Sequence, residues 1–309
     1  MTLPRQVLPG TTYMVTRRVA QRVFLLTPST VSRQVVEYCF ARALQLHPGI
    51  ELHNLEVLSN HFHAVLTDRD DSLPSFMAWV DREIAKALNE LFDRDEALWS
   101  SDHYSRVELE DSAAVFDKCS YVFVNVVKAG LVRDFRQWPG VRSEPLDWLR
   151  APKTVHRPSF YFGQKDERWA TAELRFTIPP QFRDRDPEQV VRDFNREIED
   201  RQRTYREQAR RDGKAFLGAD RVLKQSPFDR PKTPTTKGNL NPTFAAGTPE
   251  GHKRAREKRK AFLSAYRQAL ADLRKGIRAL FPAGAYLWPR LCALPCAPLQ
   301  TASCSVDSG

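Results

Sequence analysis

The chain has 309 residues, 41% of them hydrophobic and 28% charged, which is typical of a globular protein with enough apolar side chains for a core. No apolar run approaches the roughly 20 residues that span a bilayer. Residues 1–10 lack the pattern of a secretory signal, and the five cysteines lack the regular spacing of a disulfide framework. We therefore expect a cytoplasmic protein with no membrane partner.

The charge is distributed unevenly along the chain. The net charge is +10, but residues 1–150 contain 17 Lys and Arg against 20 Asp and Glu, giving −3. Residues 151–309 contain 31 against 18, giving +13. This asymmetry favours a polyanionic partner for the second part, although a region of solvated arginine-rich helices would give the same count.

Hydrophobic periodicity predicts the elements of the first 131 residues. In chain order they are a strand over 11–18, a helix that follows a cap at 27–29 and ends at 46, strands over 50–58 and 61–67, a helix over 73–92, a strand over 104–109 and a helix over 112–131. The order β-α-β-β-α-β-α predicts an α+β fold with a ferredoxin-like antiparallel sheet. We expect helices on one face of this sheet and a second face free for a substrate.

The composition changes beyond residue 150. A strand is expected over 172–178, a highly charged helix over 187–212 and a basic amphipathic helix over 250–279. We divide the chain into an α+β unit (1–148), a charged and mainly helical region (149–225), a flexible linker (226–249), a basic amphipathic helical segment (250–290) and a disordered tail (291–309).

The sharpest local pattern is Asn60-His61-Phe62-His63, on the second strand of an expected hairpin. Alternate residues of a strand face the same side, about 7 Å apart. His61 and His63 therefore project from one sheet face, while Phe62 points into the core. Two neutral imidazoles on one face are good ligands for a divalent metal. Two ordinary half-buried histidines on a polar strand face would give the same pattern.

A second pattern lies on the helix expected over 112–131. Tyr121 and Asn125 are four residues apart, so they share a face of that helix one turn apart. An Asn side-chain oxygen can supply a third metal ligand, and a phenol can act as a nucleophile once its proton is removed or a metal polarises the target. Alternatively, Tyr121 simply widens the apolar stripe of the helix.

Four segments together resemble the REP-associated tyrosine transposases, a branch of the single-tyrosine HUH transposases related to insertion-sequence transposases. They are Thr12-Tyr13-Met14-Val15-Thr16-Arg17, Leu58-Ser59-Asn60-His61-Phe62-His63, Tyr121 followed by Asn125-Val126-Val127-Lys128-Ala129-Gly130-Leu131-Val132, and Trp138-Pro139 before Ser143. The resemblance covers roughly residues 4–145 and implies that residues 1–148 form an HUH transposase catalytic domain.

The resemblance implies a concrete chemistry. His61 and His63 would hold Mg²⁺ or Mn²⁺, with Asn125 as the third ligand, and Tyr121 would attack the scissile phosphate. The products would be a 5′-phosphotyrosine and a free 3′-OH, and reversal of the step would rejoin the strands. Substrates of the family are single-stranded DNA with hairpin-forming palindromic repeats. Relatives include monomers and homodimers, so the resemblance implies a transposase and endonuclease in either state.

One departure from the family is Asn125-Val126-Val127, where the family usually has Asn-Pro-Val. Without the proline, an ordinary helix donor returns. We expect the local kink to relax, which could shift Asn125 relative to the metal.

Two alternatives to a DNA strand transferase stay open. The first is a DNA-binding protein of the same fold that no longer cuts and acts on repeats. The second is a metal phosphohydrolase that uses the histidine pair with water as the nucleophile.

Basic side chains at three places are candidates for contacts with DNA phosphates. Solvated surface positions would explain them equally well at the first strand, and a solvated helix face would explain the C-terminal run. The candidates are Arg17, Arg18 and Arg22 on or after the first strand, Lys128 in the motif after Tyr121, and Lys253, Arg254, Arg256, Lys258, Arg259 and Lys260 on the helix expected over 250–279.

Overall fold

The structure is a computed structural model that describes residues 4–100, 103–163, 166–233, 242–286, 289 and 292–299. Its main sheet has five strands in the order β2-β3-β1-β4-β7, and β5 and β6 form a second, two-stranded sheet. The strands are β1 (Thr11–Arg18), β2 (Ile50–Leu58), β3 (His61–Asp68), β4 (Ser105–Leu109), β5 (Lys153–His156), β6 (Thr171–Leu174) and β7 (Phe244–Ala245). The helices are α1 (Thr30–Leu46), α2 (Leu73–Leu91), α3 (Ser112–Phe123), α4 (Asn125–Lys128), α5 (Pro187–Arg211), α6 (Ala219–Leu223) and α7 (Pro249–Arg274).

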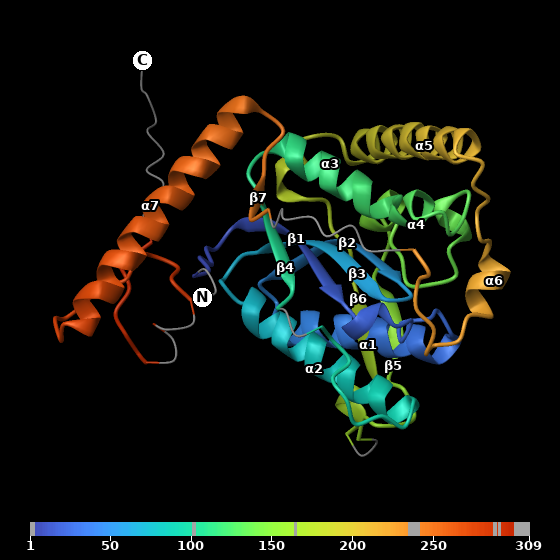
Figure 1. Ribbon diagram of the computed structural model, residues 1–309, viewed down its shortest axis with the longest axis horizontal. Coiled ribbons are helices and arrows are strands. Elements are labelled where there is room, and N and C mark those ends of the chain that lie inside the picture. The colour runs from blue at the N-terminus through green and yellow to red at the C-terminus, as the bar shows by residue number, and fades with distance from the viewer. Residues whose placement is uncertain are drawn as a thin grey trace.

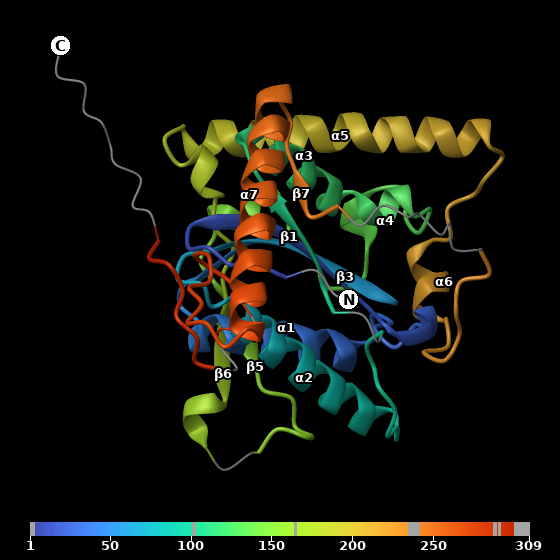
Figure 2. The same ribbon diagram turned by 60° about the vertical axis from the view of Figure 1, so that its left-hand side comes forward.

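Helices cover both faces of the main sheet (Figures 1 and 2). One face packs against α1 and α2 in a cluster that includes Val15, Phe62 and Phe76. The other face packs against α3 and α4, and α5 lies outside α3. Phe194 of α5 enters this second cluster, with its ring centroid 4.5 Å from that of Phe116.

The α+β class with a helical C-terminal region is confirmed, but two details of the expected sheet are wrong. Its second face is not free, because α3 and α4 pack on it and α5 packs outside them. Nor is it wholly antiparallel, because β7 pairs with β4 in parallel. The physical reason for the covered face lies in residues 122–127, all of which are buried. A mainly apolar helical segment that is buried on all sides needs packing partners on all sides, and α5 supplies the outer one.

The helix expected over 112–131 is broken. It ends at Phe123, and α4 starts at Asn125 after Val124, whose φ of −108° lies outside the helical range. The expectation that Val126 would relax the kink is therefore wrong. The break persists without a proline, and it coincides with the fully buried run on either side of Val124.

Regions beyond residue 149 share the cores of the first unit. β5 and β6 pack on α1, with Val155, Ala172 and Leu174 in the first cluster. β7 lies inside the segment expected to be a linker over 226–249, of which residues 234–241 are outside the described part. Of the tail expected over 291–309, only residues 292–299 are described.

Segments from later in the chain also cover both edges of the main sheet. β7 pairs with the outer edge of β4. At the opposite edge, the Val57 amide of β2 donates to the Val141 carbonyl at 2.9 Å, and the Ser143 amide donates to the Leu55 carbonyl at 2.9 Å. Residues 141–143 therefore continue the sheet beyond β2.

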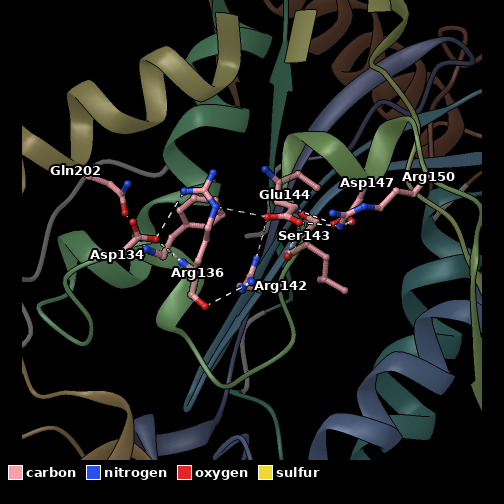
Figure 3. A network of polar contacts seen from close by, with 11 residues as sticks. Asp134, Arg136, Arg142, Ser143, Glu144, Asp147, Arg150 and Gln202 are labelled. Carbon is pink, nitrogen blue, oxygen red and sulfur yellow. Dashed lines mark hydrogen bonds and ion pairs between the residues drawn. The ribbon is translucent and has the colours of Figure 1, made fainter. Parts of the chain in front are cut away.

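A polar network holds the segment that follows α4 (Figure 3). The Glu144 carboxylate accepts a hydrogen bond from Arg150 at 2.7 Å and lies 3.7 Å from the Arg142 guanidinium. The buried Gln202 side chain of α5 accepts a hydrogen bond from the Phe135 amide at 2.8 Å. The Gln202 contact fixes the segment against α5, and the bonds of Val141 and Ser143 fix it against β2.

Candidate active site

The hairpin of β2 and β3 places His61 and His63 side by side. Their ring centroids are 4.9 Å apart. Arg18 of β1 lies across from His61 in the strand register, and Thr16 lies across from His63. Phe62 points to the opposite face and is fully buried in the first cluster. The side chains of residues 61–63 therefore alternate between the two faces, as predicted from the sequence.

Each histidine has a hydrogen-bond partner at Nδ1. The His61 Nδ1 lies 2.7 Å from the Asn60 Oδ1, and the His63 Nδ1 lies 2.7 Å from the Thr16 Oγ1. Metal-binding histidines usually have such a partner on the nitrogen that does not bind the metal. The pattern therefore fits coordination through the two Nε2 atoms.

Burial keeps both imidazoles neutral at neutral pH. Burial, together with the positive charge of Arg18, lowers the pKa of His61 to about 4. Burial also lowers the pKa of His63 well below its usual value, and His61, Arg18 and Lys128 add to this effect. A neutral imidazole has a free lone pair, so these two side chains have the protonation state that a metal ligand requires.

Tyr121 of α3 completes the group. Its ring centroid is 5.7 Å from that of His63, and the Lys128 Nζ lies 4.9 Å from the centroid of the Tyr121 ring. Burial raises the pKa of the phenol, with Tyr205 of α5 adding to the rise and Arg18 opposing it. The hydroxyl therefore stays protonated until a reaction partner or a base draws the proton away.

Asn125 lies four residues beyond Tyr121, but the break at Val124 separates them. Its side chain is buried at the start of α4. Within the described part of the chain, no group of three His, Cys, Asp or Glu side chains is arranged to hold a metal ion. Asn125 as the third ligand therefore stays a prediction.

The expected DNA-contacting residues divide into two sets. Arg18 and Lys128 are exposed beside the histidines and Tyr121. Arg17 instead faces α2, where its Nε lies 2.9 Å from an Asp81 carboxylate oxygen and its side chain is only 12% exposed. Arg22 donates from its side chain to the Thr233 carbonyl at 3.0 Å. The structure therefore does not bring Arg17 to the site.

The C-terminal basic candidates lie on α7. This helix begins beside the first residues of α3, whereas Tyr121 lies near the other end of α3. The Asp111 carboxylate caps α3 and also accepts hydrogen bonds from Gly247 and Thr248 at the start of α7. Tyr121 lies nine residues beyond the first residue of α3, which corresponds to roughly 14 Å of helix. Figure 1 shows α7 beside β4 and β7 and away from α4.

Sequence reasoning missed Glu56. This residue of β2 lies directly across from His63 and is fully buried. Neither carboxylate oxygen has a hydrogen-bond partner within the described residues. Burial raises its pKa well above the usual value, against the opposing charge of Arg142. The available signal was an acidic residue between Leu55 and Val57, in the apolar last third of the strand.

Known proteins give limited comparisons. No family model and no curated protein matches the chain. Among solved structures, a REP-associated tyrosine transposase bound to a REP hairpin aligns at 20% identity with a TM-score of 0.40, covering 58% of this chain and 99% of that one. A protein described as a candidate transposase from Deinococcus radiodurans R1 aligns at 18% identity with a TM-score of 0.27, covering 35% of this chain and 85% of that one. These scores are too low to assign an activity, so the geometry of the site carries the proposal below.

Within the described residues, no helix has the length and apolar character to cross a membrane.

Proposed function

We propose that the chain is a metal-dependent, transposase-type DNA strand transferase that cleaves and rejoins single-stranded DNA at hairpin-forming repeats through Tyr121. The observation that supports this most is the juxtaposition of three side chains. The ring of His63 lies 4.9 Å from that of His61 and 5.7 Å from that of Tyr121, centroid to centroid. These distances combine a candidate metal-ligand pair with a candidate nucleophile.

The residues of the site have separate roles in this proposal. The neutral imidazoles of His61 and His63 present lone pairs, with the Asn125 side-chain oxygen as the proposed third ligand. A bound Mg²⁺ or Mn²⁺ would polarise the scissile phosphate as a Lewis acid. Arg18 and Lys128, both exposed beside the site, would attract and orient the phosphate through their charge.

The chemical step exchanges one phosphodiester for another. The Tyr121 Oη forms a bond to phosphorus and loses its proton to solvent, while the bond from phosphorus to O3′ breaks. The leaving O3′ takes up a proton and becomes a free 3′-OH. The phosphate stays on the 5′ side as a phosphotyrosine, and attack by a 3′-OH reverses the step. Because the bond energy is retained in the phosphotyrosine, no external energy source is needed.

Trapping of the covalent adduct tests the proposal. The protein is incubated with Mn²⁺ and a hairpin oligonucleotide labelled on the 3′ side of the scissile phosphate, and adducts are resolved on a denaturing gel. Wild type should form an adduct, and Tyr121→Phe should bind the oligonucleotide without forming one. Tyr205→Phe is the matched control, because it removes a neighbouring phenol from α5 and should leave the adduct intact.

Other outcomes identify the two alternatives. If Tyr121→Phe still cleaves the oligonucleotide, water is the nucleophile and the chain is a phosphohydrolase. If wild type binds the oligonucleotide and never cleaves it, the chain is a DNA-binding protein of the same fold.

We also propose that α7 grips DNA that flanks the site. α7 contains eight Lys and Arg against three Asp and Glu, whereas α5 contains seven against six. Lys258 contacts the Glu108 carboxylate of β4, and Arg254 lies 3.9 Å from that of Glu110. Lys253, Arg256 and Lys260 are exposed. These three side chains are available to phosphates.

Salt-dependent binding tests the role of α7. Removing three phosphate contacts should lower the slope of log affinity against log salt by roughly 2 for single strands and closer to 3 for a duplex stem. An unchanged slope would refute the role. Point substitutions are preferable to deleting residues 150–309, because that deletion removes α5 from the core. The test variant carries Lys253→Ala, Arg256→Ala and Lys260→Ala, and the control carries Arg192→Ala, Arg196→Ala and Arg203→Ala on α5.

A further inference from the structure

We infer that Asn60 is a positioning residue that fixes the tautomer of His61, with the proton on Nδ1 and the lone pair on Nε2. The tautomer follows from hydrogen bonds within the chain. Only the use of the lone pair, to bind a metal ion, rests on the proposed function.

The orientation of the Asn60 amide is determined by its second contact. The Asn60 Nδ2 donates to the Arg22 carbonyl at 3.1 Å. A carbonyl only accepts hydrogen bonds, so the amide nitrogen must lie on that side and the amide oxygen on the other. The Asn60 Oδ1 therefore faces the His61 Nδ1, at 2.7 Å. An amide oxygen also only accepts, so the imidazole nitrogen must be the donor.

The remaining ring nitrogen follows by elimination. A neutral imidazole carries one proton. With that proton on Nδ1, the His61 Nε2 has a free lone pair, as a metal ligand needs. The metal-free protein therefore already holds His61 in the binding tautomer.

An unusual backbone turn presents the Arg22 carbonyl to Asn60. Gln21 and Arg22 have φ values of 52° and 63°, in the left-handed region that residues other than glycine rarely adopt. Such conformations persist where the surroundings impose them. Here the Val19 amide donates to the Asn60 carbonyl at 2.9 Å, and the Leu26 amide donates to the Ser59 carbonyl at 2.9 Å. The turn and the hairpin thus fix each other.

His63 provides a contrast within the same site. Its Nδ1 partner is the Thr16 hydroxyl, which can donate or accept. That contact does not by itself select a tautomer. Substitution of Thr16 is therefore a matched control for substitution of Asn60, because each removes one Nδ1 partner from one histidine.

NMR of the full-length, metal-free protein tests the inference directly. Long-range proton–nitrogen correlations of ¹⁵N-labelled histidine rings at pH 7.5 distinguish Nδ1–H from Nε2–H. Wild-type His61 should be in the Nδ1–H form, and Asn60→Ala should populate both forms. Asn60→Asp retains an acceptor and should retain the Nδ1–H form. Thr16→Val should leave His61 unchanged.

Titration with Mn²⁺ gives a second readout. Loss of an outer-shell partner typically weakens metal binding 10–100-fold, and we expect this for Asn60→Ala and not for Asn60→Asp. The inference is overturned if wild-type His61 is in the Nε2–H form, or if Asn60→Ala keeps both the tautomer and the affinity. If Asn60→Ala does not fold, the His61 tautomers of wild type and Asn60→Asp still test the inference. A correct tautomer without a DNA adduct would count against the proposed function alone.

Discussion

The two faces of the five-stranded sheet come from the same strands but differ in chemistry. Alternation along β1, β2 and β3 sends successive residues to opposite faces, so each strand contributes to both. The face toward α1 and α2 is mainly apolar, with Tyr13, Val15, Leu52, Phe62, Ala64 and Leu66. The face toward α3 contains the buried polar side chains Thr12, Asn54, Glu56, His63 and Thr67. Substitutions on the apolar face should therefore act through packing, and those on the polar face through hydrogen bonds and protonation.

The largest effect should come from the apolar face. Phe62→Ala removes a fully buried ring whose centroid lies 5.3 Å from that of Phe40 and 5.8 Å from that of Trp99. We expect it to lower the free energy of unfolding by about 3–5 kcal/mol, because it removes buried area and leaves a cavity. Urea denaturation measures this loss. Phe62→Leu should cost clearly less, and a loss below about 1 kcal/mol for the alanine variant would contradict the comparison.

The next effect lies on the polar face and depends on pH. His53 is fully buried, with Nδ1 2.8 Å from the Thr177 carbonyl and Nε2 2.8 Å from the Thr67 hydroxyl. Burial lowers its pKa from 6.5 to about 4. Below pH 6.5 the unfolded chain binds the proton first, so stability should fall by about 3 kcal/mol as the pH drops to 4.

His53→Gln isolates this contribution. The variant should be less stable at pH 7, because it loses buried hydrogen bonds. Its stability should decline less steeply between pH 6.5 and 4. Parallel pH profiles for the two proteins would show that His53 does not titrate on unfolding.

Glu56 should give the opposite sign on the same face. Burial raises the pKa of its carboxyl, so the folded state binds the proton more tightly than the unfolded state. Stability should therefore fall as the pH rises above 4.5, by at most about 1.4 kcal/mol per pH unit. Glu56→Gln should remove this slope, so its stability relative to wild type should increase as the pH rises. Chemical denaturation at pH 5, 7 and 8.5 measures the difference. A variant whose stability relative to wild type decreases as the pH rises would contradict this prediction.

The smallest effect compares two neighbours in β1. Val15 is fully buried on the apolar face, and the Thr16 hydroxyl contacts His63 on the polar face. Val15→Thr should cost about 1–3 kcal/mol by burying an unpaired hydroxyl. Thr16→Val should cost about 1 kcal/mol or less. Thermal unfolding of the two variants decides the order, and equal losses would show that the faces do not differ at this position.

The sequence predicted the elements of the first unit well, because their periodicity is local. Alternation alone placed His61 and His63 together and Phe62 opposite them. The same alternation puts Arg17 on the side of Val15 and away from the histidines, but its pairing with Asp81 of α2 depends on the tertiary structure. Alternation did not find β7, a two-residue strand whose only signal is its pairing with β4.

The sequence by itself determined which side chains share a face of β3, because the two-residue period follows from the backbone of any strand. Only the tertiary structure decided that α5 covers α3, that the helix breaks at Val124, and that the Arg22 carbonyl orients Asn60. These features depend on contacts between segments far apart in the chain. Such contacts form only after the loops have brought the elements together, and no local period encodes them.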